Sequence, residues 1–234
     1  MCGRYTIRFP ARMDAELFGV REWPLLPARF NIGPSSMVPL VRQDDGERDV
    51  VMARWGLIPA WAKDPAIGNK LANARGETLL EKPSFRSAWK ARRGLLPADG
   101  FYEWRKVPGT ATKQPWLLTL AGDAPFALGA LWETWRAPDG ESLVTCAVIT
   151  TASSELMAPI HERMPVIVPR AEWSEWLGER VGERVGERVG AAAGAPPAAL
   201  VASYPANEMR AVRVSTYVNA VSRDDARCVE PLSG

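Results

Sequence analysis

The sequence has 234 residues, of which 47% are hydrophobic and 24% are charged, and its formal net charge is +2. These values are typical of one folded domain and exclude a disordered, collagen-like or disulfide-stapled chain. No run approaches the roughly 18 uncharged apolar residues that a membrane helix needs, and Arg4 and Arg8 stand where a signal peptide would be apolar. We therefore expect a cytoplasmic protein with no membrane partner.

Cysteine and histidine are scarce in this chain. The three cysteines are Cys2, Cys146 and Cys228, an odd and widely spaced set that suits a reducing compartment better than a disulfide framework. His161 is the only histidine, and no Cys-x-x-Cys pair is present. A zinc site would lack its usual ligands, so we expect neither a metal nor a cofactor.

Short apolar runs bounded by Pro, Gly or Asp are typical of strands. In chain order, we expect strands at 38–42, 49–57, 94–97, 100–104, 115–120, 126–135, 143–150, 164–168 and 211–214. Helical patterns occur at 12–19, 76–81, 84–92, 152–158 and 170–177. The alternation is too irregular for repeated βαβ units. We predict an α+β fold, a single domain over 1–234 built on a largely antiparallel, barrel-like β-sheet with flanking short helices.

A low-complexity segment interrupts this pattern. Residues 178–190 read GERVGERVGERVG, and Ala, Pro and Gly dominate 191–199. A period of four is too short for a solenoid repeat, and a glycine at every fourth position weakens a helix. We interpret 178–199 as a surface insertion without a role in function.

One stretch of the chain is a candidate basic surface. It contains six positive charges, at Arg86, Lys90, Arg92, Arg93, Arg105 and Lys106. Arginine and lysine on one face are typical of nucleic-acid binding, although a solvated face without a ligand would have the same composition.

The amino terminus carries the most informative chemistry. Removal of Met1 would leave Cys2 with both a free α-amine and a thiol. The amine can add to an aldehyde to give an imine, and the thiol can then close a five-membered thiazolidine, because the second attack is intramolecular. The alternative is that Cys2 is a small hydrophobic residue buried near the chain end.

Three further positions offer matching chemistry. His161, in a proline-bracketed loop, is a natural general acid or base, or else a core histidine. Glu103 lies among aromatic residues on an expected strand, where burial would raise its pKa, or else it faces outward. Asn73 could orient a substrate while Arg75 holds a phosphate, or Asn73 could simply cap a helix.

The sequence resembles the SOS response-associated peptidase (SRAP) family, whose members form covalent crosslinks to abasic sites in single-stranded DNA. The resemblance extends over nearly the whole chain in eight ordered blocks: MCGRYT, RFNIGPSS, ARWGLIPAWAKD, NARGET, PADGFYEW, ITTASS, IHERMPVIV and VSTYVNAV. It implies a monomer that is nucleoid-associated when bound to DNA, with single-stranded DNA containing abasic sites as its partner.

The resemblance also implies site residues. Cys2 is then the crosslinking residue, and Asn73 positions its amine and the sugar. Glu103 is the acid–base group for ring opening and imine formation, and His161 its partner in proton transfer. The residues that match DNA-contacting positions are Arg4, Pro34 (in a wedge loop), Arg75, Trp104 and Thr150. The family further implies an AP-lyase side reaction and self-processing at Met1.

Gly33 departs from the family pattern, which usually has alanine there, and the GERV repeat replaces a shorter connection. Two rival functions remain open. One is an N-terminal nucleophile amidohydrolase or peptidase that uses the Cys2 amine as base for its own thiol. The other is a non-covalent reader of modified bases that uses the same groove.

Overall fold

The computed structural model describes residues 2–44, 46–179 and 198–232. Its strands are β1 (Tyr5–Ile7), β2 (Arg29–Ile32), β3 (Met37–Asp44), β4 (Glu47–Trp55), β5 (Asn73–Arg75), β6 (Arg93–Ala98), β7 (Gly100–Lys106), β8 (Lys113–Leu120), β9 (Phe126–Arg136), β10 (Ser142–Ala152), β11 (Arg163–Pro165), β12 (Ile167–Val168) and β13 (Met209–Arg213). The α-helices are α1 (Ala15–Phe18), α2 (Pro83–Ala91) and α3 (Trp173–Leu177). Short 3-10 turns connect many of these elements.

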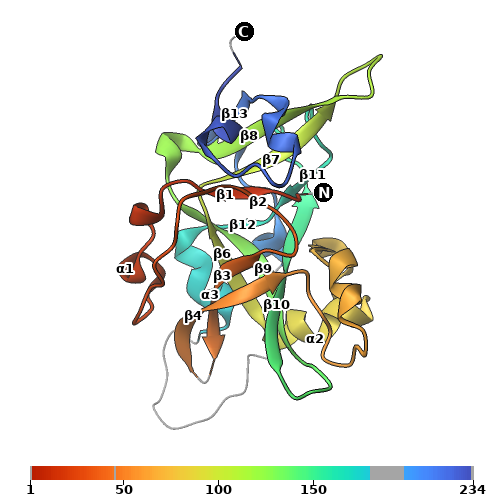
Figure 1. Cartoon of the computed structure of the whole chain (residues 1–234). Helices are drawn as coiled ribbons and strands as arrows, with labels where there is room; N and C mark the ends of the chain where they lie inside the picture. The colour runs from red at the N-terminus through yellow and green to blue at the C-terminus, as the bar shows by residue number, and fades with distance from the viewer. Residues whose placement is uncertain (1, 45, 180–197, 233–234) are drawn as a thin grey trace.

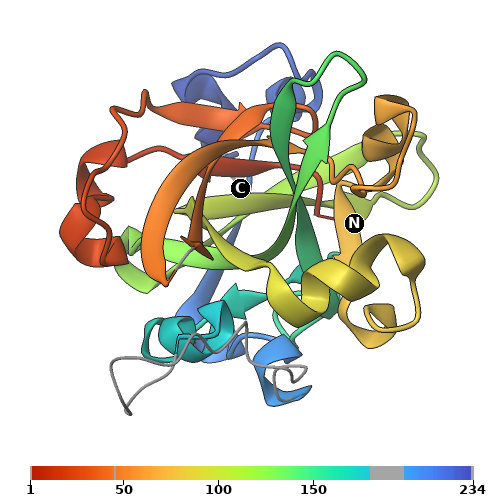
Figure 2. The ribbon, with the colours of Figure 1, turned by 90° about the horizontal axis from the view of Figure 1, so that it is seen from below.

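Five strands close a barrel. β10, β4, β3, β6 and β9 pair in that order, and β9 pairs back onto β10. Only the β10–β4 contact in this ring is parallel. The second sheet, in the order β13-β8-β7-β1-β2, lies across one end of the barrel (Figure 1), and the ring itself is visible from below (Figure 2). The predicted α+β, largely antiparallel and barrel-like architecture is confirmed.

Helix α3 covers the outside of the barrel because one strand leaves room for it. A Cβ added to Gly129 on β9 would lie 2.7 Å from the Trp176 ring, so only glycine permits this approach. Trp176 is fully buried and donates its indole N–H to Gly94 O at 2.9 Å. Arg93 on β6 donates to Trp176 O at 2.5 Å. This burial on both faces explains why β6 contains no exposed residue.

Every predicted strand run corresponds to observed strand, with 164–168 divided between β11 and β12. Strands β1, β2 and β5 were not predicted. The helix expected at 152–158 is wrong, because β10 continues to Ala152 and residues 155–160 form hydrogen-bonded turns. Nearly all of the predicted insertion at 178–199 lies outside the described residues; Gly178 ends α3 with a positive φ of 81°.

Candidate active site and nucleic-acid interface

Cys2 is placed by the pairing of β1 with β7. Tyr5 pairs with Phe101, Thr6 with Gly100, and Tyr102 N donates to Arg4 O at 3.0 Å. Continuing this antiparallel register brings Cys2 beside the segment that carries Glu103. Burial raises the pKa of the fully buried Cys2 thiol, and the charge of Glu103 raises it further. The thiol and the carboxyl group are therefore electrostatic neighbours.

Glu103 is a buried carboxyl group with 2% of its surface exposed. Burial raises its pKa to about 7, while the positive charges of the amino terminus and Lys113 oppose the shift. The protonated and ionised forms are thus both populated near neutral pH, which is the condition a proton-transfer group needs. The alternative that Glu103 faces outward is wrong.

His161 belongs to the same electrostatic environment. Its pKa is lowered first by burial and then by the charge of the amino terminus, and Lys113 also lowers it. The amino-terminal charge acts on Cys2 and Glu103 as well. Nδ1 of His161 lies 3.0 Å from Arg163 N and 3.2 Å from Arg163 O. Arg163 N can donate to an unprotonated Nδ1, and Arg163 O can accept from a protonated Nδ1. The charge of the amino terminus therefore influences Cys2, Glu103 and His161 alike.

Asn73, Arg75 and Thr150 come together through strand pairing. Asn73 pairs with Val148 and Arg75 with Thr150 in the parallel β5–β10 contact. On the other edge of β10, Thr150 pairs with Pro165 of β11, the strand that follows His161. Among the described residues, the buried Oδ1 atom of Asn73 has no hydrogen-bond partner. Because Asn73 lies in a strand, the helix-cap alternative is wrong.

Arg163 links the elements around Thr150. Its guanidinium forms two hydrogen bonds with Glu77, at 2.5 and 2.9 Å, and donates to Thr150 O at 2.6 Å. An open pocket of about 400 Å³ lies here, lined by Arg75, Glu77, Thr78, Glu162 and Arg163. Sequence analysis did not single out Arg163, although it lies in the IHERMPVIV block two residues after His161.

Arg4 and Trp104 lie together on the outer face of the second sheet. Arg4 is half-buried, and burial lowers its pKa. Its guanidinium donates to Asn31 Oδ1 at 2.8 Å and lies 5.7 Å from the centre of the Trp104 ring. Asn31 is a second residue that sequence analysis missed, although it stands inside the RFNIGPSS block. Arg4 is held by the protein before any ligand arrives.

Pro34 is exposed in a tight turn. Ser36 N donates to Gly33 O at 3.2 Å, and Ser35 has a positive φ of 71°, which together are typical of a type II turn with Pro34 at its second position. A Cβ on Gly33 would lie 3.3 Å from the Arg4 side chain and 3.4 Å from Val221. Gly33 therefore lies directly against Arg4.

The predicted basic surface is wrong as a single patch. Arg93 is only 6% exposed, since its guanidinium donates to Trp176 O and Trp89 O. Arg92 pairs with Glu133 at 2.7 Å. The members on α2 and those on β7 lie at opposite ends of the molecule (Figure 1).

Neither a metal cluster nor a membrane helix is present among the described residues. They contain no cluster of three or more His, Cys, Asp or Glu side chains arranged to hold a metal ion. No helix among them has the length and apolar character needed to cross a membrane.

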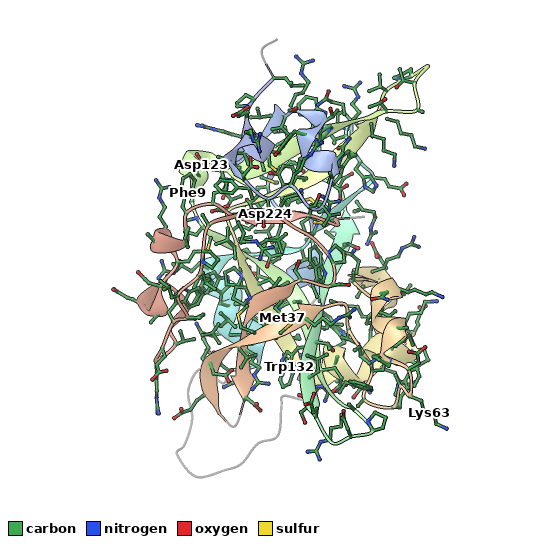
Figure 3. The ribbon with its side chains drawn as sticks, in the orientation of Figure 1. Phe9, Met37, Lys63, Asp123, Trp132 and Asp224 are labelled. Atoms are coloured by element: carbon green, nitrogen blue, oxygen red, sulfur yellow. The ribbon has the colours of Figure 1, made fainter. Side chains whose placement is uncertain are left out.

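Most tryptophan side chains pack inside the protein, but Trp61 is 62% exposed. It lies in the connection between β4 and β5, where Lys63 projects from the barrel (Figure 3).

Comparison with solved structures identifies the class of fold. A protein from Bordetella bronchiseptica superposes with a TM-score of 0.73 at 27% identity, covering 92% of this chain and 100% of that chain. A protein from Bacteroides thetaiotaomicron also gives a TM-score of 0.73, at 25% identity, covering 87% of this chain and 85% of the other.

Comparison of sequences identifies the family. The family model described as SOS response associated peptidase (SRAP) matches residues 1–221. The abasic site processing protein YoqW of Bacillus subtilis (strain 168) is 37% identical over 235 residues, which cover 98% of this chain and 99% of YoqW. The abasic site processing protein HMCES of Gallus gallus is 32% identical, covering 91% of this chain and 68% of HMCES. This chain belongs to the SRAP family.

Proposed function

We propose that this protein recognises abasic sites in single-stranded DNA and traps them as a covalent thiazolidine through Cys2, after removal of Met1. The observation that carries this proposal is the buried Cys2 thiol with the buried Glu103 carboxyl group as its electrostatic neighbour, whose pKa is about 7, and the pKa of His161 responds to the same amino-terminal charge. The names of the relatives YoqW and HMCES support the abasic site as the substrate.

The chemistry follows from the substrate. An abasic deoxyribose exists partly as a ring-opened aldehyde, and opening the ring moves a proton from the anomeric hydroxyl group to the ring oxygen. Glu103 can accept and return this proton because both of its forms are populated at neutral pH. The Cys2 amine then adds to the aldehyde, and loss of water gives the imine. Addition of the thiol across the C=N bond forms the C–S bond, the nitrogen gains the proton, and the thiazolidine is complete.

The raised pKa of the Cys2 thiol favours this order of events over amide hydrolysis. A cysteine hydrolase needs a thiolate as its first nucleophile, and such thiolates have lowered pKa values. Burial and the charge of Glu103 have the opposite effect here. In the proposed reaction the amine attacks first and the thiol only closes the ring, so a largely protonated thiol is sufficient.

The DNA-binding roles of Arg4, Pro34, Arg75, Trp104 and Thr150 belong to the same proposal. The exposed Pro34 turn stands beside Arg4, which lies against Trp104, so these three form one surface. Arg75 lines the open pocket near Thr150. Contacts with phosphates predict that binding weakens as salt increases.

The test uses Cys2→Ala with Cys146→Ala as the matched control, since Cys146 is also buried but lies on β10. Each protein is incubated with a single-stranded oligonucleotide from which uracil has been excised, and products are separated on denaturing gels with and without borohydride. We expect a heat-stable adduct from the control. We expect Cys2→Ala to give only a borohydride-trapped imine with some strand cleavage by β-elimination, because its amine remains but its sulfur does not.

Four outcomes would contradict the proposal. The thiazolidine is excluded if Cys2→Ala gives a heat-stable adduct without reductant. The requirement for a free amine fails if intact-mass analysis finds Met1 on the crosslinked protein. A non-covalent reader is indicated if wild-type complexes dissolve in detergent, and an amidohydrolase if the purified protein releases ammonia from glutamine.

A further inference from the structure

The C-terminal segment 215–224, here called the strap, closes the edge of the second sheet. β2 is the edge strand of that sheet, and its outer N–H groups would otherwise lack partners. Asp224 accepts hydrogen bonds from Phe30 N at 2.5 Å and Asn31 N at 2.8 Å and is ion-paired with Arg29. Figure 3 shows Asp224 against this sheet. The strap is thus a built part of the fold.

A buried amide fixes the shape of the strap. Asn31 is 1% exposed, and its Nδ2 group donates to the carbonyl oxygens of Val218, Ala220 and Arg223 at 3.0, 3.1 and 2.7 Å. Its Oδ1 atom accepts from Arg4 at 2.8 Å. A fully satisfied buried amide holds its partners in one arrangement. Asn31 therefore hydrogen-bonds to both the strap and Arg4 and fixes their relative positions.

The strap in turn contacts both Arg4 and Trp104. Arg4 donates to Val218 O at 3.1 Å, and the Trp104 indole N–H donates to Asn219 Oδ1 at 2.7 Å. Arg4 lies 5.7 Å from the centre of the Trp104 ring. Asn219 is itself exposed, so its contact with Trp104 is a surface hydrogen bond and not part of the core.

We propose that Asn219 is a positioning residue for DNA binding, which fixes the indole of Trp104 so that a base beside the lesion can stack on its solvent-exposed part. This inference rests on the proposed function, since it assumes that single-stranded DNA occupies this face. An aromatic ring fixed before binding loses less side-chain freedom when a base stacks on it.

The test is a double-mutant cycle of Asn219→Ala and Trp104→Phe, with Ser222→Ala as control. Ser222 is an exposed polar residue on the same strap. Crosslinking is measured under single-turnover conditions as a function of abasic oligonucleotide concentration, and binding of an undamaged single strand is measured by fluorescence anisotropy. We expect Asn219→Ala to raise the half-saturating concentration about three- to tenfold, the range for losing one ordinary hydrogen bond, and to leave the maximal rate unchanged.

The double-mutant cycle shows whether Asn219 affects DNA binding through Trp104. Trp104→Phe keeps an aromatic ring but removes the N–H donor, so Asn219→Ala should add less than about twofold in that background. Asn219→Asp retains the acceptor oxygen, and it should bind within about twofold of wild type at high salt, where its charge is screened. Ser222→Ala should behave as wild type.

Equal effects of Asn219→Ala in both backgrounds would overturn the inference, as would unchanged binding or an aspartate variant as weak as the alanine variant. A reduced maximal rate with lowered thermal stability would assign Asn219 to the fold. If the proposed function is wrong, the wild-type protein itself makes no crosslink. The anisotropy measurements on undamaged DNA then still test the role of Asn219 in binding.

Discussion

Glu103→Gln tests the proton-transfer role directly, because the pKa of Glu103 fixes the pH range in which activity must change. With a pKa of about 7 instead of the usual 4.5, the carboxyl group is about 9% ionised at pH 6 and about 91% at pH 8. If the ionised form accepts the proton in ring opening, its contribution to the rate should rise about tenfold between these values. The ionised fraction of a carboxyl group with the usual pKa would change by only about 3% over the same range.

The assay is single-turnover crosslinking at saturating abasic oligonucleotide from pH 5.5 to 8.5, with wild type and Glu103→Gln compared at each pH. The Cys2 amine, whose ordinary pKa is near 7.7–8, titrates in both proteins and largely cancels in the ratio of their rates. We expect that ratio to rise about tenfold from pH 6 to pH 8, and to reach about 10²–10⁴. A ratio that does not change with pH would refute the reasoning.

The same substitution has an expected effect on stability. Because the folded-state pKa of Glu103 is raised, its favourable contribution is fully present below about pH 4.5 and is lost as pH rises through about 7. The neutral glutamine avoids the burial of a charge. Glu103→Gln should therefore be more stable than wild type at pH 8, by up to about 3 kcal/mol, and nearly equal to it at pH 4.5. Urea unfolding at the two pH values measures this difference.

Three further substitutions test the packing around the site, each by thermal or urea unfolding. Asp99 is 1% exposed and accepts hydrogen bonds from the β1 region, so Asp99→Ala should cost about 3–5 kcal/mol, and a loss below about 1 kcal/mol would contradict this reading. Gly129→Ala should cost about 1–3 kcal/mol because the new methyl group would meet the Trp176 ring, and an unchanged midpoint would show that α3 shifts freely. Gly33→Ala should cost less than about 1 kcal/mol, because the facing Arg4 side chain can move by a few tenths of an ångström, and a larger loss would mean that Arg4 is rigidly fixed.

The barrel was predictable from sequence because its strands are long apolar runs between clear breakers. Strands β1 and β5 were not, since three residues carry too little pattern and their conformation depends on the strands they pair with. The wrong helix at 152–158 has a local reason. Pro159 has no N–H group and disfavours helical geometry in the preceding residue, so the bonds from Met157 and Ala158 to Ser154 O close turns and do not propagate.

The chemistry of the site was more predictable than its surroundings. Residue type alone marked Cys2, Glu103 and His161 as candidates, and the family blocks supplied their grouping. Sequence could not reveal that Arg93 is buried, because its partners are backbone carbonyl groups of distant elements and leave no pattern in residue type. The role of Asn219 could not be predicted for a similar reason, because its hydrogen-bond partner Trp104 is 115 residues away along the chain.

The site depends on the docking of the two sheets, because its groups come from both. Glu103 is on β7 of the second sheet and Cys2 precedes β1 of the same sheet, whereas Asn73 is on a strand paired with the barrel and His161 precedes another such strand. Asp99 lies between β6 of the barrel and β7 of the second sheet and accepts hydrogen bonds from Thr6 in β1 and from Phe9 just after it, so the join near the amino terminus is held by hydrogen bonds to a buried carboxylate. In the proposed reaction this join holds Cys2, whose amine and thiol must reach the same carbon in turn.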